Sequence, residues 1–185
     1  SRILEIRKKY NLPKKYILYL GTLEPRKNII GLIKAFEILN TKYKLVIAGS
    51  KGWLYEDIFK IVKNSPAKDN IIFTGFIDDK DKAALYGLAD LFVYPSFYEG
   101  FGFPPLEAMA AGTPVITSNF SSLPEAVGDA AITVNPYNID ELTKAIEMVL
   151  FDEKLRDILI ERGYKKVKNF SWEKCAKETL EFILR

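Results

Sequence analysis

The chain has 185 residues, 48% of them hydrophobic, which suits one domain with a sizeable core. Its 27 basic and 24 acidic residues leave a net charge of +3, spread along the chain, so charge does not predict a nucleic-acid partner. One cysteine, Cys175, excludes an internal disulfide, and the absence of histidine removes the usual zinc ligand and the commonest general base. We expect a cytoplasmic protein without a signal peptide or membrane-spanning helix.

Apolar runs alternate with helical patterns from the start of the chain to residue 134. Residues 1–10 predict a short helix, which Asn11-Leu12-Pro13 ends. Predicted strands cover 16–20, 45–48, 71–74, 91–94, 115–117 and 131–134, and helices are predicted from 29, at 55–64 and 83–89, after Pro104, and at 121–127. With right-handed crossovers, this order predicts an α/β fold: a Rossmann-like, doubly wound, open parallel sheet of about six strands with helices on both faces.

The pattern becomes wholly helical after Asp140. Three apolar stripes begin at Leu142, Leu155 and Trp172, and Ser171 is a candidate N-cap for the last of them. We therefore expect a helical C-terminal extension, in which Cys175 is packed or half-exposed.

The most informative stretch runs from Tyr94 to Ile116 and predicts a strand, a loop and a helix. Gly100 and Gly102 let the loop backbone approach a ligand closely, and Pro104-Pro105 suit a first helical turn. The N–H groups and the positive dipole end at the helix start favour a phosphate. Glu99 stands at the lip of the loop and Glu107 about one turn inside the helix. Either glutamate alone fits an ordinary helix-start or turn role equally well.

Two adjacent cations, Arg26 and Lys27, precede a predicted helix at the same edge of the sheet. In an open α/β sheet, ligands bind beyond the carboxyl ends of the strands, so these side chains are natural partners of a diphosphate. The alternative is a solvated pair in a loop.

The string from Glu99 to Val115, EGFGFPPLEAMAAGTPV, closely resembles the paired-glutamate signature of family-four retaining glycosyltransferases. These enzymes use nucleotide-sugar donors and have the two-Rossmann-domain (GT-B) architecture. The resemblance extends over nearly the whole chain. It implies that residues 1–185 form a single nucleotide-sugar-binding domain, the C-terminal half of an enzyme whose N-terminal half binds the acceptor.

The resemblance also implies roles for individual residues. Lys27 matches a cation that contacts the donor diphosphate, and Arg26 is expected to assist because Thr22 stands where many members carry arginine. Glu107 matches the glutamate that binds the ribose hydroxyls, and Glu99 the one near the transferred sugar. Glu99, Arg26 and Lys27 are therefore the predicted catalytic residues. The other predicted donor-binding residues are Gly21, Thr22, Gly49, Gly75, Phe76, Ile77, Gly100, Phe101, Gly102, Phe103 and Leu106.

Two other motifs point elsewhere. Asp79-Lys80-Asp81 resembles the metal-binding aspartate pair of glycosyltransferases of another fold, but its place before a predicted helix favours capping. Gly100-Phe101-Gly102 lacks the third glycine of a dinucleotide fingerprint, and no acidic residue ends the second strand. We therefore expect neither a bound metal nor a cofactor.

The resemblance implies transfer of a hexose from a nucleotide diphosphate sugar to a saccharide or lipid-linked acceptor in polysaccharide biosynthesis. The segment from Thr22 to Asn28 is most similar to mannosyltransferases, which favours GDP-mannose and leaves a UDP-sugar open. The full-length enzyme is expected to associate peripherally with a membrane. The alternatives are a non-catalytic nucleotide-binding module and an epimerase or phosphorylase of the same fold. The domain alone is expected to bind the donor without turnover.

Overall fold

The centre of the fold is a parallel sheet. The computed structural model describes residues 2–184, so Ser1 and Arg185 of the predicted domain lie outside the described residues. Within them, six strands pair in the order β3-β2-β1-β4-β5-β6, all parallel. Their bounds are β1 (Tyr16–Leu20), β2 (Lys44–Ala48), β3 (Ile71–Gly75), β4 (Leu91–Tyr94), β5 (Val115–Ser118) and β6 (Ile132–Val134). The prediction of a doubly wound, six-stranded parallel sheet is confirmed.

The central strands form where the apolar runs are continuous. All residues of β1, β4 and β5 are buried, as expected for strands covered on both faces. Strand β1 pairs with β2 on one side and with β4 on the other, so the strand order reverses between β1 and β4. The carboxyl ends of these two strands flank the switch point, where open α/β sheets bind ligands.

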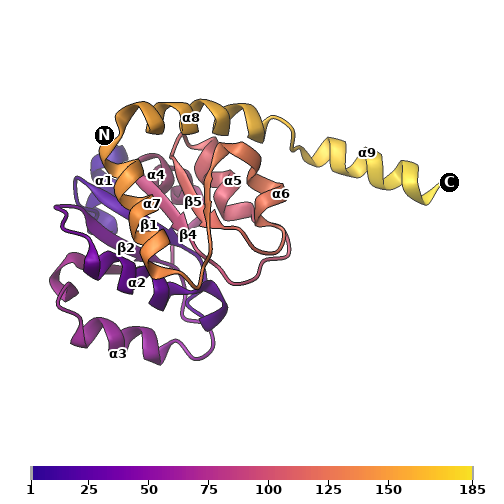
Figure 1. The fold of residues 1–185 in the computed structure, drawn as a ribbon. Coiled ribbons are helices and arrows are strands. Elements are labelled where there is room, and N and C mark those ends of the chain that lie inside the picture. Colours follow the sequence, from indigo (N-terminus) through magenta and orange to yellow (C-terminus); the bar gives the residue numbers. More distant parts are fainter. Residues whose placement is uncertain (1, 185) are drawn as a thin grey trace.

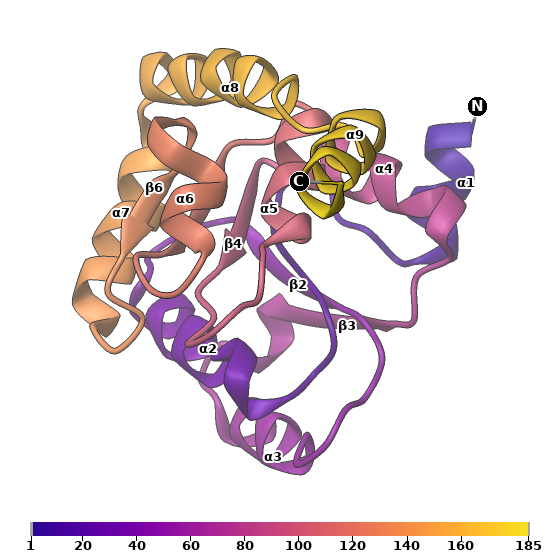
Figure 2. The same cartoon turned by 90° about the vertical axis from the view of Figure 1, so that its right-hand side faces the viewer.

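Helices cover both faces of the sheet, as Figures 1 and 2 show. Right-handed crossovers place the helices after β1 and β2 on one face and those after β3, β4 and β5 on the other. On the first face, α2 packs against α3 and α7; on the second, α5 packs against α4 and α6, and α1 against α4. The bounds are α1 (Arg2–Lys9), α2 (Ile29–Ile38), α3 (Glu56–Asn64), α4 (Asp79–Gly87), α5 (Phe103–Ala110), α6 (Leu123–Val127) and α7 (Ile139–Phe151).

Helix α4 begins four residues earlier than predicted, at Asp79 instead of Ala83. The predicted capping role of the aspartates is wrong for this reason: Asp79 and Asp81 lie inside the first turn, and Asp78 at the N-cap makes no side-chain capping bond. Asp81 is buried and accepts hydrogen bonds from Lys9 Nζ at 2.8 Å and Tyr10 Oη at 2.9 Å. This aspartate therefore ties the N-terminal helix to the domain.

Two further helices confirm the C-terminal extension. Helix α8 (Glu153–Val167) packs against α5, whereas α9 (Trp172–Ile183) extends away from the sheet and has no buried residue (Figure 1). The Ser171 hydroxyl accepts a hydrogen bond from the Lys174 N–H at 3.1 Å, which confirms the predicted N-cap. Cys175 is exposed on α9 and is not packed. Among residues 2–184, no helix combines the length and apolar character that crossing a bilayer requires.

Candidate functional site

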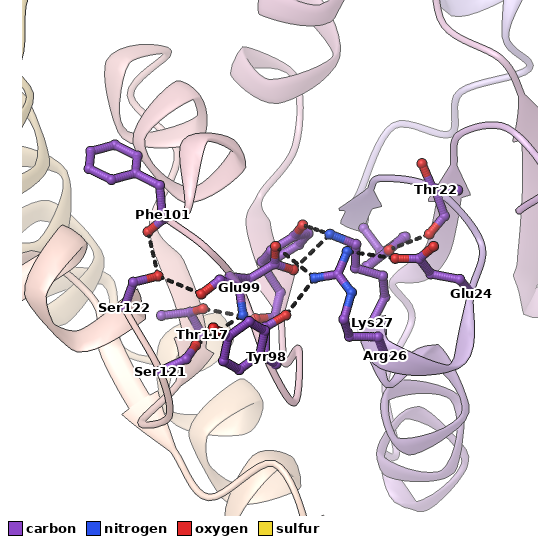
Figure 3. Close-up of polar contacts among 12 residues, drawn as sticks. Thr22, Glu24, Arg26, Lys27, Tyr98, Glu99, Phe101, Thr117, Ser121 and Ser122 are labelled. Carbon is purple, nitrogen blue, oxygen red and sulfur yellow. Dashed lines mark hydrogen bonds and ion pairs between the residues drawn. The ribbon is translucent and has the colours of Figure 1, made fainter.

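A buried ion pair lies at the carboxyl edge of the sheet, between the ends of β1 and β4. Lys27 ends a 3₁₀ turn (Pro25–Lys27) after β1, and Glu99 lies in the loop after β4. Lys27 Nζ donates to Glu99 Oε1 at 2.7 Å and to the Tyr94 hydroxyl at 2.6 Å. Both charged side chains are about nine-tenths buried. The structure therefore brings the predicted cation and the first predicted glutamate into direct contact (Figure 3).

Arg26 completes this charged cluster from its exposed side. Its guanidinium is 3.1 Å from Glu99 Oε2 and 2.6 Å from Glu24 Oε1, and it donates to the Tyr98 carbonyl. The Arg26 side chain is 39% exposed, against 9% for Lys27. Arg26 is thus the cation accessible to an incoming anion, whereas Lys27 binds Glu99 from the buried side of the cluster.

The electrostatics of the cluster keep Glu99 ionised. Burial by itself would raise the pKa of the Glu99 carboxyl, but the hydrogen bond from Lys27, the neighbouring Ser96 and Tyr94 hydroxyls and the lysine charge together outweigh burial and lower the pKa below its ordinary value. Burial also raises the pKa of the Tyr94 hydroxyl, reinforced by the Glu99 charge, so this phenol stays protonated. The site presents a fixed carboxylate at neutral pH.

Two serines clamp the loop that carries Glu99. The Glu99 N–H donates to Ser121 Oγ at 3.0 Å, and Ser122 Oγ donates to the carbonyls of Glu99 at 2.9 Å and Phe101 at 3.0 Å (Figure 3). Both serines belong to the loop after β5, and Ser121 has a positive φ of 54°. Sequence reasoning missed these residues as part of the site; the signal available was their position beyond the carboxyl end of a strand.

The start of α5 has a restricted set of free donors. Pro104 and Pro105 lack backbone N–H groups. The backbone N–H groups without a partner inside the helix are therefore those of Phe103 and of the residues before it. Gly102 at the N-cap has a φ of +112°, and a Cβ there would lie 2.9 Å from Leu123 Cδ2. Gly100 is exposed, with no atom near the position of a Cβ, so packing does not require glycine there.

The rings of Phe101, in this loop, and of Phe103, at the start of α5, pack toward the C-terminal segment. Phe101 packs on Phe103 (centroids 4.8 Å apart) and on Phe170 (5.8 Å), and Phe103 stacks on Trp172 at 6.1 Å. These rings join the loop to the beginning of α9. The side chains of Phe101 and Phe103 remain partly exposed, at 39% and 51%.

Glu107 lies in a separate groove between α4 and α5. The groove has a volume of about 560 Å³ and is lined by Asp79, Lys82, Ala83, Tyr86, Glu107, Ala110 and Ala111. The Tyr86 hydroxyl donates to Glu107 Oε2 at 2.9 Å, and Lys82 Nζ lies 2.6 Å from Asp79 Oδ1. The two predicted glutamates thus lie in different places: Glu99 is at the carboxyl edge of the sheet, and Glu107 is in the groove between α4 and α5. Sequence reasoning missed Tyr86 and Lys82, whose helical spacing from Asp79 was the available signal.

Three predicted glycines hold the ends of β1, β2 and β3 together. The Gly21 N–H donates to the Ala48 carbonyl at 3.0 Å, and the Gly49 N–H donates to the Gly75 carbonyl at 2.8 Å. Gly49 has a φ of +135°, and a Cβ there would lie 2.0 Å from the Gly21 carbonyl oxygen. These glycines permit close approach of backbones. The Thr22 side chain is exposed, and its carbonyl accepts from the Tyr19 hydroxyl at 3.1 Å.

Two of the predicted donor-binding residues have side chains in the core. Ile77 is 3% exposed and Leu106 is 7% exposed, so both side chains pack inward and leave only backbone atoms for a ligand. Phe76, between Gly75 and Ile77, is 67% exposed.

The aspartates at the start of α4 are all engaged with cations, including Asp79 and Asp81, which resemble a metal-binding pair. Asp78 and Asp81 bind Lys9, and Asp79 binds Lys82. In the part of the chain that the structure describes, no group of three or more Asp, Glu, Cys or His side chains is arranged to hold a metal ion.

The charged cluster of Arg26, Lys27 and Glu99 is called the edge cluster below. The fold and the edge cluster define a Rossmann-like α/β domain of the GT-B class. Residues 3–166 match the family of glycosyl transferases group 1, and the chain belongs to this family. The chain is 42% identical to the O-antigen chain mannosyltransferase B of Escherichia coli over 185 residues, covering 97% of this chain and 49% of that protein. It therefore spans about half the length of this relative.

Solved structures share the fold. The Anabaena protein HepE in complex with UDP-glucose superposes with a TM-score of 0.87 at 19% identity, over 98% of this chain and 52% of HepE. The C-terminal domain of the Francisella tularensis glycosyl transferase group 1 family protein LpcC superposes with a TM-score of 0.75 at 26% identity, over 88% of this chain and 91% of that domain.

Proposed function

We propose that this chain is the donor-binding half of a retaining glycosyltransferase that transfers a hexose from a nucleotide diphosphate sugar. GDP-mannose is the preferred donor, supported by the mannosyltransferase relative and by the segment from Thr22 to Asn28. A UDP-sugar is the alternative, because HepE was solved with UDP-glucose. The acceptor is a saccharide or lipid-linked saccharide, in line with the O-antigen relative.

The observation that carries the proposal is that two different polar sites lie along helix α5, one beside its start and one at its middle. Beside its start lie Arg26, Lys27 and Glu99, and halfway along it Glu107 faces the groove shared with α4. A nucleotide diphosphate sugar has matching parts. The groove offers a carboxylate for the ribose diol, with Asp79 and Lys82 as acceptor and donor for a base edge. The edge cluster offers a cation for the diphosphate.

The chemistry assigned to these residues is electrostatic. Arg26 and the positive end of α5 stabilise the negative charge that develops on the leaving diphosphate. Glu99, held ionised by Lys27, lies beside the transferred sugar. The acceptor hydroxyl oxygen bonds to the anomeric carbon on the face from which the diphosphate departs, which retains the configuration. The bond from that carbon to the diphosphate oxygen breaks, and this oxygen takes up the hydroxyl proton. A metal ion has no assigned part in this step.

The remaining part of the enzyme is the acceptor-binding half. The chain spans half of its mannosyltransferase relative, and it aligns with nearly all of a solved C-terminal domain, which supports its assignment as the C-terminal half. We assign the complete enzyme to polysaccharide assembly in the cytoplasm, with peripheral attachment to the membrane.

Calorimetry tests the proposed function directly. The 185-residue chain is titrated with UDP, GDP and ADP and their hexose conjugates, with and without a metal chelator. We expect one nucleotide and its sugar conjugate to bind, with unchanged affinity in the chelator. If none of the nucleotides binds, the proposed function is wrong; if binding needs a divalent ion, the metal-free diphosphate site is wrong.

A further inference from the structure

Tyr86 joins the wall of the α4 groove to the carboxylate of Glu107. Its side chain is 1% exposed, and its ring packs edge-to-face on Phe92 with centroids 5.2 Å apart. Only the hydroxyl edge reaches the groove, where it donates to Glu107 Oε2 at 2.9 Å. A buried tyrosine thus ends in a single polar contact with the predicted ribose ligand.

The backbone at Tyr86 is fixed independently of the groove. Thr113 Oγ1 donates to the Tyr86 carbonyl at 2.6 Å, and the Ala89 N–H donates to the same oxygen at 2.9 Å. Thr113 is itself buried. The phenol therefore approaches Glu107 from a rigid support on the far side of the groove.

The Glu107 side chain is conformationally less restricted than the Tyr86 side chain. It is an exposed residue of α5, and a glutamate side chain on a helix surface has several accessible rotamers. Burial raises the pKa of the Tyr86 hydroxyl, and the Glu107 charge raises it further, so the phenol is a proton donor at neutral pH. One bond from a fixed donor selects one orientation of the carboxylate.

We propose that Tyr86 is a positioning residue of the nucleotide site, which fixes Glu107 so that its remaining acceptor positions face the ribose hydroxyls. The inference rests on the proposed function, because it requires Glu107 to bind ribose. A carboxylate has about four acceptor positions, so one bond to Tyr86 leaves enough for a vicinal diol. The phenol touches no ligand atom; it acts through Glu107. Its loss therefore affects ligands that carry ribose hydroxyls and spares those that lack them.

The test compares Tyr86→Phe with the unaltered 185-residue chain by calorimetry. The ligands are GDP and 2′,3′-dideoxy-GDP, with UDP and 2′,3′-dideoxy-UDP measured in parallel. Tyr16→Phe is the matched control, because Tyr16 is also a buried phenol, donating to the Leu85 carbonyl at 2.8 Å, but does not line the groove. We expect Tyr86→Phe to weaken binding of the ribonucleotide about fivefold and to leave the dideoxynucleotide unchanged. Tyr16→Phe leaves both affinities unchanged.

Each other outcome is decisive. Equal losses for the two ligands would show that Tyr86 only shapes the groove, and no loss for either would show that Glu107 is oriented without it; both overturn the inference and leave nucleotide binding standing. Equal affinity of the unaltered chain for ribose and dideoxyribose ligands also overturns it, because Glu107 would then not bind ribose. Failure of every nucleotide to bind would overturn the proposed function itself.

Discussion

Lys27 and Glu99 are 72 residues apart in the chain and form an ion pair of 2.7 Å in which each side chain is about nine-tenths buried. The pair connects the loop after β1 to the loop after β4, across the point where the strand order reverses. Taking charges out of water is costly, and their attraction offsets this cost only while both partners are present. The stability of the fold is therefore coupled to the geometry of the candidate site.

Removing the lysine charge should destabilise the domain. Lys27→Met leaves Glu99 buried with Arg26 as its remaining cationic partner, and breaking such a pair costs about 3 kcal/mol. Urea unfolding measures the change. Lys60→Met is the control, because Lys60 pairs with Asp57 on the exposed surface of α3 and should leave the free energy of unfolding nearly unchanged. An equally stable Lys27→Met variant would contradict the structural role of the pair.

The contribution of Glu99 to stability should depend on pH. Its pKa in the folded chain lies below the ordinary value of 4.5, so between these two values the unfolded chain binds more protons. The stabilisation is complete above pH 4.5 and is lost as the pH falls through the folded pKa. We expect the difference in unfolding free energy between the unaltered chain and Glu99→Gln to be constant from pH 7 to 5.5 and to shrink below pH 4.5. A difference that grows on acidification would reverse the assigned pKa direction.

The two glutamates should separate nucleotide binding from sugar binding. Glu107→Ala removes charge-assisted hydrogen bonds to ribose, each worth about 1.5–3 kcal/mol, so GDP or UDP should bind at least tenfold more weakly. Glu99→Gln should bind the free nucleotide as before and lose affinity for the intact nucleotide sugar. Calorimetry with both ligands distinguishes the variants, and circular dichroism checks that each is folded. Equal losses for nucleotide and nucleotide sugar in Glu99→Gln would refute this division.

Helix α9 should be the least protected element of the 185-residue chain. None of its residues is buried, and Trp172 at its start stacks on Phe103 of the domain. Amides in segments with little buried surface exchange through local opening, so those of α9 should exchange far faster than those of β1, whose residues are all buried. Hydrogen-exchange mass spectrometry measures the contrast. Protection of α9 equal to that of β1 would be inconsistent with the structure.

A feature of this chain could be predicted when the residues that determine it lie close together in the sequence. The bounds of β1 are those predicted, because a continuous apolar run closed by Gly21 carries its signal locally. The predicted start of α4 was wrong, because Asp78, Asp79 and Asp81 all suit a helix start. The bond from Tyr86 to Glu107 depends on how two helices pack, which local patterns do not encode. The apolar residues of α9 predicted a helix, but they did not predict that none of its residues is buried in this domain.

The last prediction concerns catalysis by residues 1–185 alone. If the proposed function holds, these residues carry the nucleotide groove and the edge cluster, so they should bind the donor. The acceptor site belongs to the other half of the enzyme, and holding two reactants together supplies about 7–11 kcal/mol of barrier reduction. We therefore expect binding without measurable transfer. The assay incubates the chain with the best-binding nucleotide sugar and with saccharide or lipid-linked acceptors, and follows release of nucleoside diphosphate. The complete enzyme, assayed in parallel, is the positive control, and its turnover also excludes a non-catalytic module. Release by residues 1–185 at the rate of the complete enzyme would show that this domain holds the whole catalytic site, and the two-half assignment would be wrong.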